Sequence, residues 1–525
     1  MSGASGRNIA TQSYDDSGRQ NHSVITDTKE KDVKVTIYKM PDRVIPVIFL
    51  PGVMGSNLKG ELDKKIWHAD LFKGVEALGW TTKTAKERKQ LLDPQTSEVD
   101  DSGKVLYNDQ EGKMFPSRRQ RGWGSALYKS YGEPLHVLQF MLNDGNILLD
   151  NLLNGTRRLT TRQQLIGENL NAERGEEALT ESEVRHSYDF LFPLHVFGYN
   201  WLKSNADSAK KLEEFIQATL ATYQGRLAQN KVILVTHSMG GLVARHYSEN
   251  MGGQDKILGM VHGVMPDLGS PATYRRMKTG ERGIVGAVIG SNMEQLMPVL
   301  AQSPGPLQLL PGTAYGLGWL RIQDGRETQI KPLFDPYDEI YLNKADWWRL
   351  YDAGISKGTA DEEWTKYRKI IEGDVQDFIQ DLNTKYHPNT WAFYGASKDN
   401  PSDENLTWRK KRTFETSPQL PVQAVAGIVR TPTNRVIRES EWQPDNNGLV
   451  SEFELVSSGS PGDGTVPTRS GGITSPIIRS LLATDVDHEG AYAVGNIDMG
   501  NNLSIAMKFT LRAIVKMVRE VPPCG

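Results

Sequence analysis

Four short, mostly apolar runs mark the chain at 47–50, 232–235, 257–264 and 391–394. Runs of four to eight apolar residues without alternation are typical of strands buried on both faces, as in a parallel sheet. The first run, Val-Ile-Phe-Leu, ends at Pro51-Gly52, which predicts a turn at its carboxyl end. We therefore expect several buried strands, far apart in sequence, to share one sheet.

A helical pattern precedes the second run and covers about 206–224. Apolar residues recur there at three- and four-residue spacing among Lys, Glu and Gln, namely Leu212, Phe215, Ile216, Leu220 and Tyr223. This spacing places one apolar stripe along an α-helix. Helix followed by buried strand is one step of an α/β unit. The sequence thus predicts a mostly parallel central sheet with helices on both faces.

Two stretches exceed what a minimal α/β unit needs, a charged one at about 70–185 and one rich in Gly, Pro, Met and Trp at about 283–385. We interpret both as insertions over one end of the sheet. The predicted organisation is a mobile arm at 1–40, core at 41–75, an insertion at 76–185, core at 186–282, a cap or lid at 283–385, and core at 386–525 with a further inserted segment at about 398–450.

Composition and charge exclude several classes of protein. With 24% charged and 38% hydrophobic residues, the 525-residue chain has ordinary globular composition, and its net charge of −3 argues against a nucleic-acid partner. Cys524 is the one cysteine, so neither an intramolecular disulfide nor a Cys-based zinc site can form. No His or Asp cluster has metal-ligand spacing and no phosphate-loop motif occurs, so we expect no metal and no cofactor.

Membrane insertion and conventional export are also not indicated. No apolar run approaches the ~20 residues that span a bilayer. The first 20 residues lack the apolar stretch of a cleavable signal peptide, so we expect synthesis in the cytoplasm without such a signal.

A candidate nucleophile lies directly after the second apolar run. Ser238 stands in Thr-His-Ser-Met-Gly, followed by residues that can begin a helix. Strand, tight turn and helix form the context of a nucleophile elbow, which needs small residues two positions before and after the serine. Gly240 satisfies one side, whereas Thr236 departs from the usual glycine on the other.

The loop after the first run, PGVMGSN, supplies candidate oxyanion donors. A tetrahedral intermediate in acyl transfer needs preorganised backbone N–H groups. In the elbow arrangement one donor is the residue after the nucleophile, here Met239, and the other lies in an upstream loop where glycine permits close approach. We assign the second donor to Val53, with Met54 as the neighbouring alternative.

The general base should follow the nucleophile, because this fold carries its triad in the order Ser, acid, His. Of the ten histidines, His246, His262, His387 and His488 lie after Ser238. The first two fall in a helix and a strand candidate, which favours packing roles, and His387 precedes the best acid candidate. We therefore select His488, in the polar loop DVDHEG near the end of the chain.

The acid candidate is Asp463, in SPGDGTVP. Glycine on both sides places its carboxylate on a tight loop, where it can orient the Nδ1–H of a histidine. An ordinary Asp-Gly turn is the alternative. Asp485 and Asp487 are rivals, but residues so close to His488 in sequence would need a special loop to reach its far ring nitrogen.

Several strings in combination resemble the α/β-hydrolases of the lecithin:cholesterol acyltransferase and lysosomal phospholipase type. They are LPGVMGSNL with IWHADLF, VFGYNWLKSNADSAKKLEEFI, VILVTHSMGGLVARHY, GVMPDLGSP, GPLQLLP and GDGTVP. The resemblance implies Ser238, Asp463 and His488 as the triad and Val53 with Met239 as oxyanion donors. Asn200 departs from it, standing where the group tends to have Asp, and the insertions have no counterpart.

The predicted activity is hydrolysis of carboxylic esters in phospholipids or other long-chain lipids through an acyl-enzyme. Apolar residues after the elbow either bind the acyl chain or form the core of the cap; the candidates are Ile284, Val288, Met293, Leu296 and Met297. Membrane contact would then come through the cap. A lipid acyltransferase is one alternative function, and a non-catalytic lipid- or partner-binding module is another.

The general make-up of the chain is also similar to the lipase effectors that bacteria inject into rivals by type VI secretion. This resemblance implies signal-independent delivery into the periplasm of a target cell. It further implies a cognate immunity protein or a component of the secretion machine as partner.

Overall fold

A computed structural model describes residues 11–14, 20–23, 41–68, 79–106, 114–144, 158–281, 283–352, 355, 360–415, 436–439, 449–494 and 503–522. Most of the predicted arm at 1–40 lies outside these residues. Within them, only Thr11–Tyr14 (β1) and Gln20–Ser23 (β2) are placed, and they pair antiparallel.

A six-stranded sheet forms the centre of the molecule, in the order β20-β14-β11-β10-β4-β9, and every neighbouring pair is parallel. The strands are β4 (Val47–Leu50), β9 (Leu194–Val196), β10 (Val232–His237), β11 (Ile257–Gly263), β14 (Thr390–Gly395) and β20 (Ser480–Thr484). The four predicted apolar runs supply four of these strands, which confirms the predicted parallel sheet.

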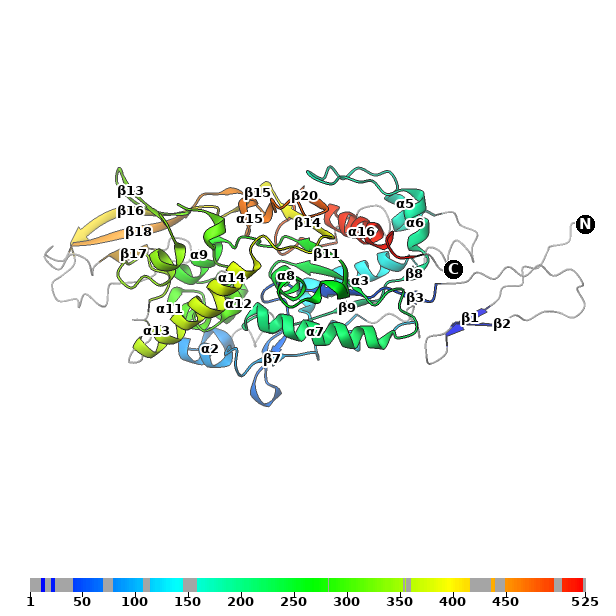
Figure 1. Ribbon diagram of the computed structural model, residues 1–525. Helices are drawn as coiled ribbons and strands as arrows, with labels where there is room; N and C mark the ends of the chain where they lie inside the picture. Colours follow the sequence, from blue (N-terminus) through cyan, green and yellow to red (C-terminus); the bar gives the residue numbers. More distant parts are fainter. Residues whose placement is uncertain are drawn as a thin grey trace, which may run out of the picture.

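Helices cover both faces of this sheet (Figure 1). Alternate strand residues point to opposite sides, so Ile48 and Leu234 join one apolar cluster while Phe49 and Val235 join the other. The first cluster contains residues of α7 (Asn205–Thr222) and α8 (Gly240–Asn250), and the second contains residues of α3 (Tyr128–Asn143) and α16 (Ile505–Val518). The predicted helix at about 206–224 is α7.

Helices after the elbow extend the first cluster away from the sheet. They are α9 (Pro271–Thr279), α10 (Gly283–Ile289), α11 (Met293–Leu300), α12 (Pro304–Leu307), α13 (Ala360–Lys369) and α14 (Asp377–Leu382), with π-helices at Tyr337–Tyr341 and Ile370–Gln376. Helix α2 (Ala85–Leu91), from the first insertion, packs against α11. The two predicted insertions therefore meet in space.

A second, five-stranded sheet lies at the left of Figure 1, in the order β13-β12-β16-β18-β17. Its strands are β12 (Leu320–Asp324), β13 (Glu327–Lys331), β16 (Leu406–Glu415), β17 (Val436–Glu439) and β18 (Leu449–Ser457). The first two come from the stretch assigned to the cap and the others from 398 onward. The sequence analysis did not predict this sheet.

Short elements complete the described chain. The strands are β3 (Arg43–Val44), β5 (Leu58–Lys59), β6 (Lys65–Trp67), β7 (Glu98–Val99), β8 (Phe190–Leu191), β15 (Ser397–Ser402) and β19 (Ser460–Gly462). The helices are α5 (Thr161–Gln164), α6 (Glu181–Ser187) and α15 (Thr468–Gly471), with 3₁₀ turns at Glu61–Asp63, Trp123–Ser125, Gly253–Lys256 and Thr313–Tyr315.

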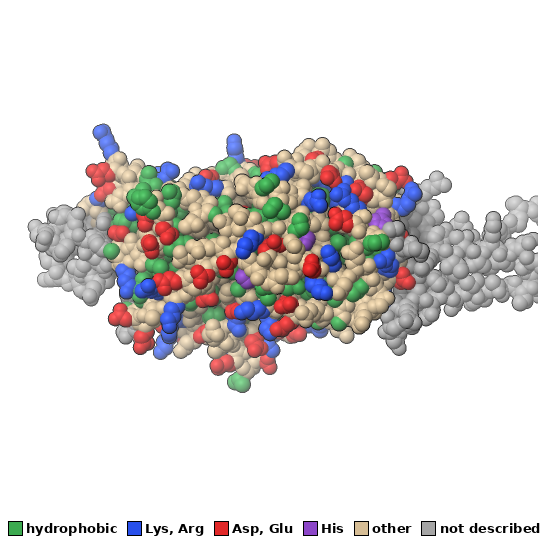
Figure 2. Space-filling view, viewed as in Figure 1, with side chains coloured by type: hydrophobic (Ala, Val, Ile, Leu, Met, Phe, Trp, Pro, Cys, Tyr) green, Lys and Arg blue, Asp and Glu red, His purple; other side chains and the backbone are tan. Residues whose placement is uncertain are grey.

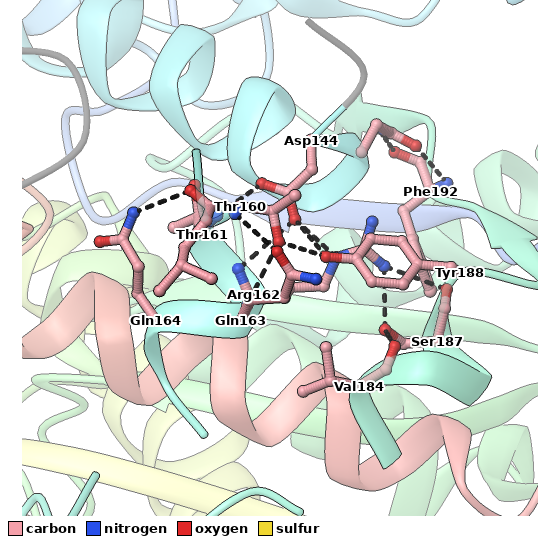
Figure 3. A network of polar contacts seen from close by, with 12 residues as sticks. Asp144, Thr160, Thr161, Arg162, Gln163, Gln164, Val184, Ser187, Tyr188 and Phe192 are labelled. Atoms are coloured by element: carbon pink, nitrogen blue, oxygen red, sulfur yellow. Dashed lines mark hydrogen bonds and ion pairs between the residues drawn. The ribbon is translucent and has the colours of Figure 1, made fainter. Parts of the chain in front are cut away.

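A buried ion pair fixes the end of α3 against α5 and α6 (Figure 3). Arg162 Nε lies 2.9 Å from Asp144 Oδ2, and both side chains are almost fully buried. Asp144 also accepts from the Thr161 N–H at 3.0 Å, while Arg162 donates to the carbonyl and hydroxyl oxygens of Ser187 and lies 4.0 Å from the centre of the Tyr188 ring. Each charged group thus has hydrogen-bond partners, as burial requires.

Charges of both signs are interspersed over the face seen in Figure 2, which agrees with the small net charge of −3. No helix among the described residues has the length and apolar content needed to cross a bilayer. The same residues hold no group of three or more His, Cys, Asp or Glu side chains suited to a metal ion.

Candidate active site

Ser238 lies on a strained turn between β10 and α8, at the carboxyl edge of the central sheet. Its φ of 51° is in the left-handed region, which residues with a Cβ seldom adopt. The turn is held because the Ser238 N–H donates to the Gly263 carbonyl at 2.9 Å. A Cβ on Gly240 would come within 2.6 Å of the Pro51 carbonyl oxygen, so this position requires glycine. These features are those of a nucleophile elbow.

His488 contacts both other predicted triad residues. Its Nε2 lies 2.9 Å from Ser238 Oγ and its Nδ1 lies 2.8 Å from Asp463 Oδ2. Since a carboxylate only accepts, Nδ1 carries the proton and Nε2 is left to accept from the serine. Ser238 and Asp463 are each 2% exposed. The arrangement can take a proton from Ser238 and return it to a leaving group.

The loop around Asp463 holds its carboxylate in place. Oδ1 accepts from the N–H groups of Thr465 and Val466 at 2.9 and 2.6 Å, which leaves Oδ2 for the imidazole. The His488 N–H donates to the Asp463 carbonyl at 2.8 Å, so the acid and base loops are also joined through the backbone. Asp463 is thereby directed toward Nδ1 of His488.

The rival residues have other roles. Asp485 and Asp487 are exposed, and Asp487 accepts from the Gly490 N–H. His246 stacks on Phe378. His262 Nδ1 bonds Thr236 Oγ1 at 2.8 Å, and His387 accepts from the Asn389 N–H.

Both departures from the family pattern have partners in the structure. The hydroxyl of Thr236, in the position usually held by a glycine, bonds His262 on the adjacent strand. Asn200 donates its amide to the carbonyl and hydroxyl oxygens of Ser97, at 2.9 and 3.0 Å. Aspartate could not donate these bonds, so Asn200 suits an insertion that presents acceptors.

Most backbone groups of the loop at 51–55 are fixed by a partner. Pro51 C=O accepts from Tyr199 Oη at 2.8 Å, Gly52 N–H donates to Tyr131 Oη at 3.0 Å, and Gly52 C=O accepts from the Gly55 N–H at 3.0 Å. Met54 C=O accepts from Trp67 Nε1 at 2.8 Å, and Gly55 C=O accepts from the Leu127 N–H, also at 2.8 Å. The loop therefore holds one shape before any substrate binds.

Three N–H groups of this region stay available, those of Val53, of the alternative donor Met54 and of Met239. Among hydrogen bonds between described residues, none uses any of these three N–H groups. The loop lies beside the nucleophile, because a Cβ on Gly52 would be 3.0 Å from the Cβ of Ser238. A fixed loop with unused donors beside the serine can bind an oxyanion.

The cap residues lie in the core of the cap in this conformation. Val288, Met293, Leu296 and Met297 are at most 2% exposed and belong to the same apolar cluster as Met239. The side chain of Ile284 lies outside the described part of the structure. Apolar side chains thus pack together from the elbow into the cap. These four residues line no open groove for an acyl chain.

Sequence reasoning missed Tyr131 and His237, which lie between the oxyanion loop and the base loop. Tyr131 comes from the first insertion, where no pattern indicated a role in the site. His237 stands beside the nucleophile, and that position was the signal that could have directed attention to it.

Comparison with known proteins identifies the family. A family model described as lecithin:cholesterol acyltransferase matches residues 194–475, more than half of the chain. The chain belongs to the lecithin:cholesterol acyltransferase family. It is therefore an α/β-hydrolase, as predicted, of the acyl-transferring and lipolytic class. Ser238, Met239 and Asp463 lie inside the matched range, whereas Val53 and His488 lie outside it.

A solved structure gives a longer match. The crystal structure of the Tle4–Tli4 complex contains a chain with 26% sequence identity and a TM-score of 0.73, covering 91% of this chain and 99% of that one. The structural similarity thus extends beyond the family range to most of the molecule. No curated protein matches the sequence.

Proposed function

We propose that this member of the lecithin:cholesterol acyltransferase family is a serine hydrolase. It cleaves carboxylic esters of phospholipids or other long-chain lipids through an acyl-enzyme. The observation that carries the proposal is the continuous chain Asp463–His488–Ser238, with contacts of 2.8 and 2.9 Å. The unused N–H groups of Val53 and Met239 support it.

In this mechanism Ser238 Oγ bonds to the ester carbonyl carbon while His488 Nε2 takes its proton. Val53 and Met239 donate to the oxyanion, each contributing about 10²–10³ in rate. The C–O bond to the alcohol then breaks, and His488 protonates the leaving alcohol. Water repeats the sequence on the acyl-enzyme and releases the fatty acid. Asp463 stabilises the imidazolium throughout.

Substrate access requires movement of the cap. Ser238 is 2% exposed, and the cap core at Val288, Met293, Leu296 and Met297 is closed. We propose that these side chains part to admit an acyl chain, since each methylene buried there contributes about 0.8 kcal/mol to binding. A lipid surface would favour the open form, because it covers apolar surface that water would otherwise contact.

Membrane contact has a specific candidate surface, which we call the apolar rim. Within the predicted cap range, Leu317, Ile330, Leu333 and Phe334 are 53%, 45%, 50% and 85% exposed. Gly316, next to Leu317, lies near Arg469 of the acid loop region. The segment before Leu317 thus lies against α15, which follows the acid loop in the sequence.

The deciding experiment compares the purified protein with Ser238→Ala on a panel of phospholipids and triglycerides, with products identified by mass. We expect turnover to fall about 10⁴–10⁶-fold in the variant. Substantial activity in Ser238→Ala would overturn the proposal, and lack of activity in both proteins would favour the binding module. Adding a long-chain alcohol distinguishes the acyltransferase, because acyl transfer would yield a new ester in place of free fatty acid.

We also propose that the protein acts as an exported antibacterial effector with a cognate protein partner. Support comes from its similarity to a chain crystallised in complex with Tli4. The protein should be tolerated in the bacterial cytoplasm and toxic when a fused secretion signal places it in the periplasm, with Ser238→Ala harmless in both. Equal toxicity of Ser238→Ala, or no toxicity in either compartment, would contradict the effector role and leave the hydrolase chemistry standing.

A further inference from the structure

A buried chain of hydrogen bonds joins the oxyanion loop to the backbone of the general base. The Gly52 N–H donates to Tyr131 Oη at 3.0 Å, and Tyr131 Oη lies 2.7 Å from His237 Nδ1. His237 Nε2 lies 2.7 Å from the carbonyl oxygen of His488. The chain therefore links β4's loop, helix α3, the end of β10 and the base loop.

The hydrogen-bond partners determine which atom carries each proton in this chain of hydrogen bonds. A carbonyl oxygen only accepts, so His237 Nε2 carries hydrogen and donates to His488. Nδ1 must then accept, so the Tyr131 hydroxyl donates to it while its oxygen accepts from Gly52. Burial lowers the pKa of His237 to about 3 and raises the pKa of the Tyr131 phenol, so both groups stay neutral near pH 7. The direction of donation along these hydrogen bonds therefore stays the same over the pH range in which an esterase works.

Aromatic packing holds the two side chains in place. The Tyr131 ring lies 5.3 Å from that of Phe49, and the His237 ring lies 6.1 Å from that of Tyr492, measured between ring centres. The Tyr492 hydroxyl donates to the Thr236 carbonyl at 3.1 Å, next to His237 in the chain. Tyr131 and His237 are buried, 4% and 6% exposed.

We propose that Tyr131 and His237 are positioning residues that set the oxyanion donor and the general base relative to Ser238. Gly52 directly precedes Val53 in the sequence, and His237 directly precedes Ser238. The carbonyl that His237 contacts belongs to His488, the general base itself. Tyr131 therefore connects Gly52 and His237, each of which is next to a reacting group in the sequence. Displacement of about 1 Å at such groups can cost about 10²-fold in rate.

This inference rests on the proposed function, and its first test is Tyr131→Phe. The change removes one oxygen, keeps the ring against Phe49, and leaves the Gly52 N–H and His237 Nδ1 without a partner. We expect kcat on a soluble ester to fall about 10–100-fold with KM within about threefold. A purely structural role predicts a lower unfolding midpoint with kcat and KM unchanged, and that result would overturn the inference.

Elsewhere in the protein, Tyr223→Phe offers a matched control. Tyr223 is also buried, and its hydroxyl bonds His195 Nε2 at 2.9 Å. It packs with Val44 and Leu191, before the amino ends of the strands and thus opposite Ser238. We expect Tyr223→Phe to lower the unfolding midpoint without changing kcat. An equal loss of kcat in both Tyr→Phe variants would show a general stability effect and overturn the inference.

A second pair of variants keeps the inference testable if Tyr131→Phe fails to fold. In His237→Gln the amide nitrogen can occupy the place of Nε2 and still donate to the His488 carbonyl. In His237→Asn the shorter amide reaches only the place of Nδ1, so that carbonyl loses its donor. We expect kcat of His237→Gln to be at least about tenfold higher than kcat of His237→Asn. The reason is that the reaction requires the general base to be held in position, and only the glutamine keeps the donor to the His488 carbonyl.

Two further comparisons separate the possible failures. Combining Tyr131→Phe with His237→Asn should cost less than the product of the single losses, because both break one chain. Equal kcat for His237→Gln and His237→Asn, or multiplicative losses in the double variant, would overturn the positioning role. Failure of the proposed function appears separately, as activity that survives Ser238→Ala.

Discussion

Gly52 lies so close to Ser238 that a Cβ built on the glycine would be 3.0 Å from the Cβ of the serine and 2.9 Å from Nδ1 of His237. The oxyanion loop and the nucleophile turn can thus approach this closely because residue 52 is a glycine and has no side chain. A methyl group there would push the loop away from the serine and displace the proposed Val53 donor.

Gly52→Ala should accordingly lower kcat by about 10²-fold, the range expected when one oxyanion donor is lost. Gly373→Ala is the control, because a Cβ at Gly373 meets nothing within 4 Å. Steady-state kinetics on a soluble ester would compare the two. Wild-type kcat in a folded Gly52→Ala protein would contradict the assigned position of the oxyanion site.

Asp463→Asn should reduce kcat by about 10⁴-fold, because the amide presents a donor to His488 and favours the wrong tautomer. Asp485→Asn and Asp487→Asn should stay within about threefold of wild type, since neither carboxylate bonds the imidazole in the structure. Kinetics of the three variants would check this. A severe effect at Asp487 with a mild one at Asp463 would show that the acid is wrongly assigned.

Phe334→Asp should weaken activity on phospholipid vesicles while leaving hydrolysis of a soluble short-chain ester unchanged. The side chain is 85% exposed, so the change costs little stability but removes an apolar group from the apolar rim. Vesicle co-sedimentation and both activity assays measure the difference. Equal losses on vesicles and soluble ester, or no loss on either, would argue against membrane contact at this surface.

Asp144→Ala should lower the free energy of unfolding by about 3–5 kcal/mol, because Arg162 would remain buried without its counter-ion. The pair is 2% and 0% exposed at its side chains. Glu214→Ala is the control: its ion pair with Lys211 is 66% and 69% exposed, and we expect a change of about 0.5 kcal/mol or less. Urea unfolding would decide, and similar midpoints for both variants would contradict the structural role of the buried pair.

Acid should destabilise the protein below about pH 6.5, before most carboxylates titrate. Burial lowers the pKa values of His195, His237 and His262 to about 3, so between pH 6.5 and 3 the unfolded chain binds more protons than the folded one. The free energy of unfolding therefore falls as pH falls, by up to about 1.4 kcal/mol per pH unit for each histidine. Above pH 6.5 this contribution is fully present.

Denaturant unfolding at pH 7.5, 6.0 and 5.0 measures how the free energy of unfolding changes with pH. His195→Gln should reduce this slope near pH 5 by the contribution of one proton. His195 is suited to the test because its contact with Tyr223 lies away from the site. Equal stability at pH 7.5 and 5.0 would contradict the prediction.

The sequence by itself determined the elements whose signals are local. Apolar runs predicted four of the six strands of the parallel sheet, period 3.6 predicted α7, and small residues around Ser238 predicted the elbow. Chain order and glycine-flanked loops were enough to single out Asp463 and His488 as candidates. These features depend on a few adjacent residues, which is why they can be read without the fold.

Tertiary structure decided what depends on contacts between distant residues. The positions of Tyr131 and Asn200, the joining of 320–331 with 406–457 in a second sheet, and the closed packing of Val288 and Met297 have no local pattern. They arise because segments of the insertions pack against a face of the sheet, as α3 does, and against one another, as α2 and α11 do, and must pair their polar groups there. Segments far apart in the sequence meet only once packing has fixed where each insertion lies.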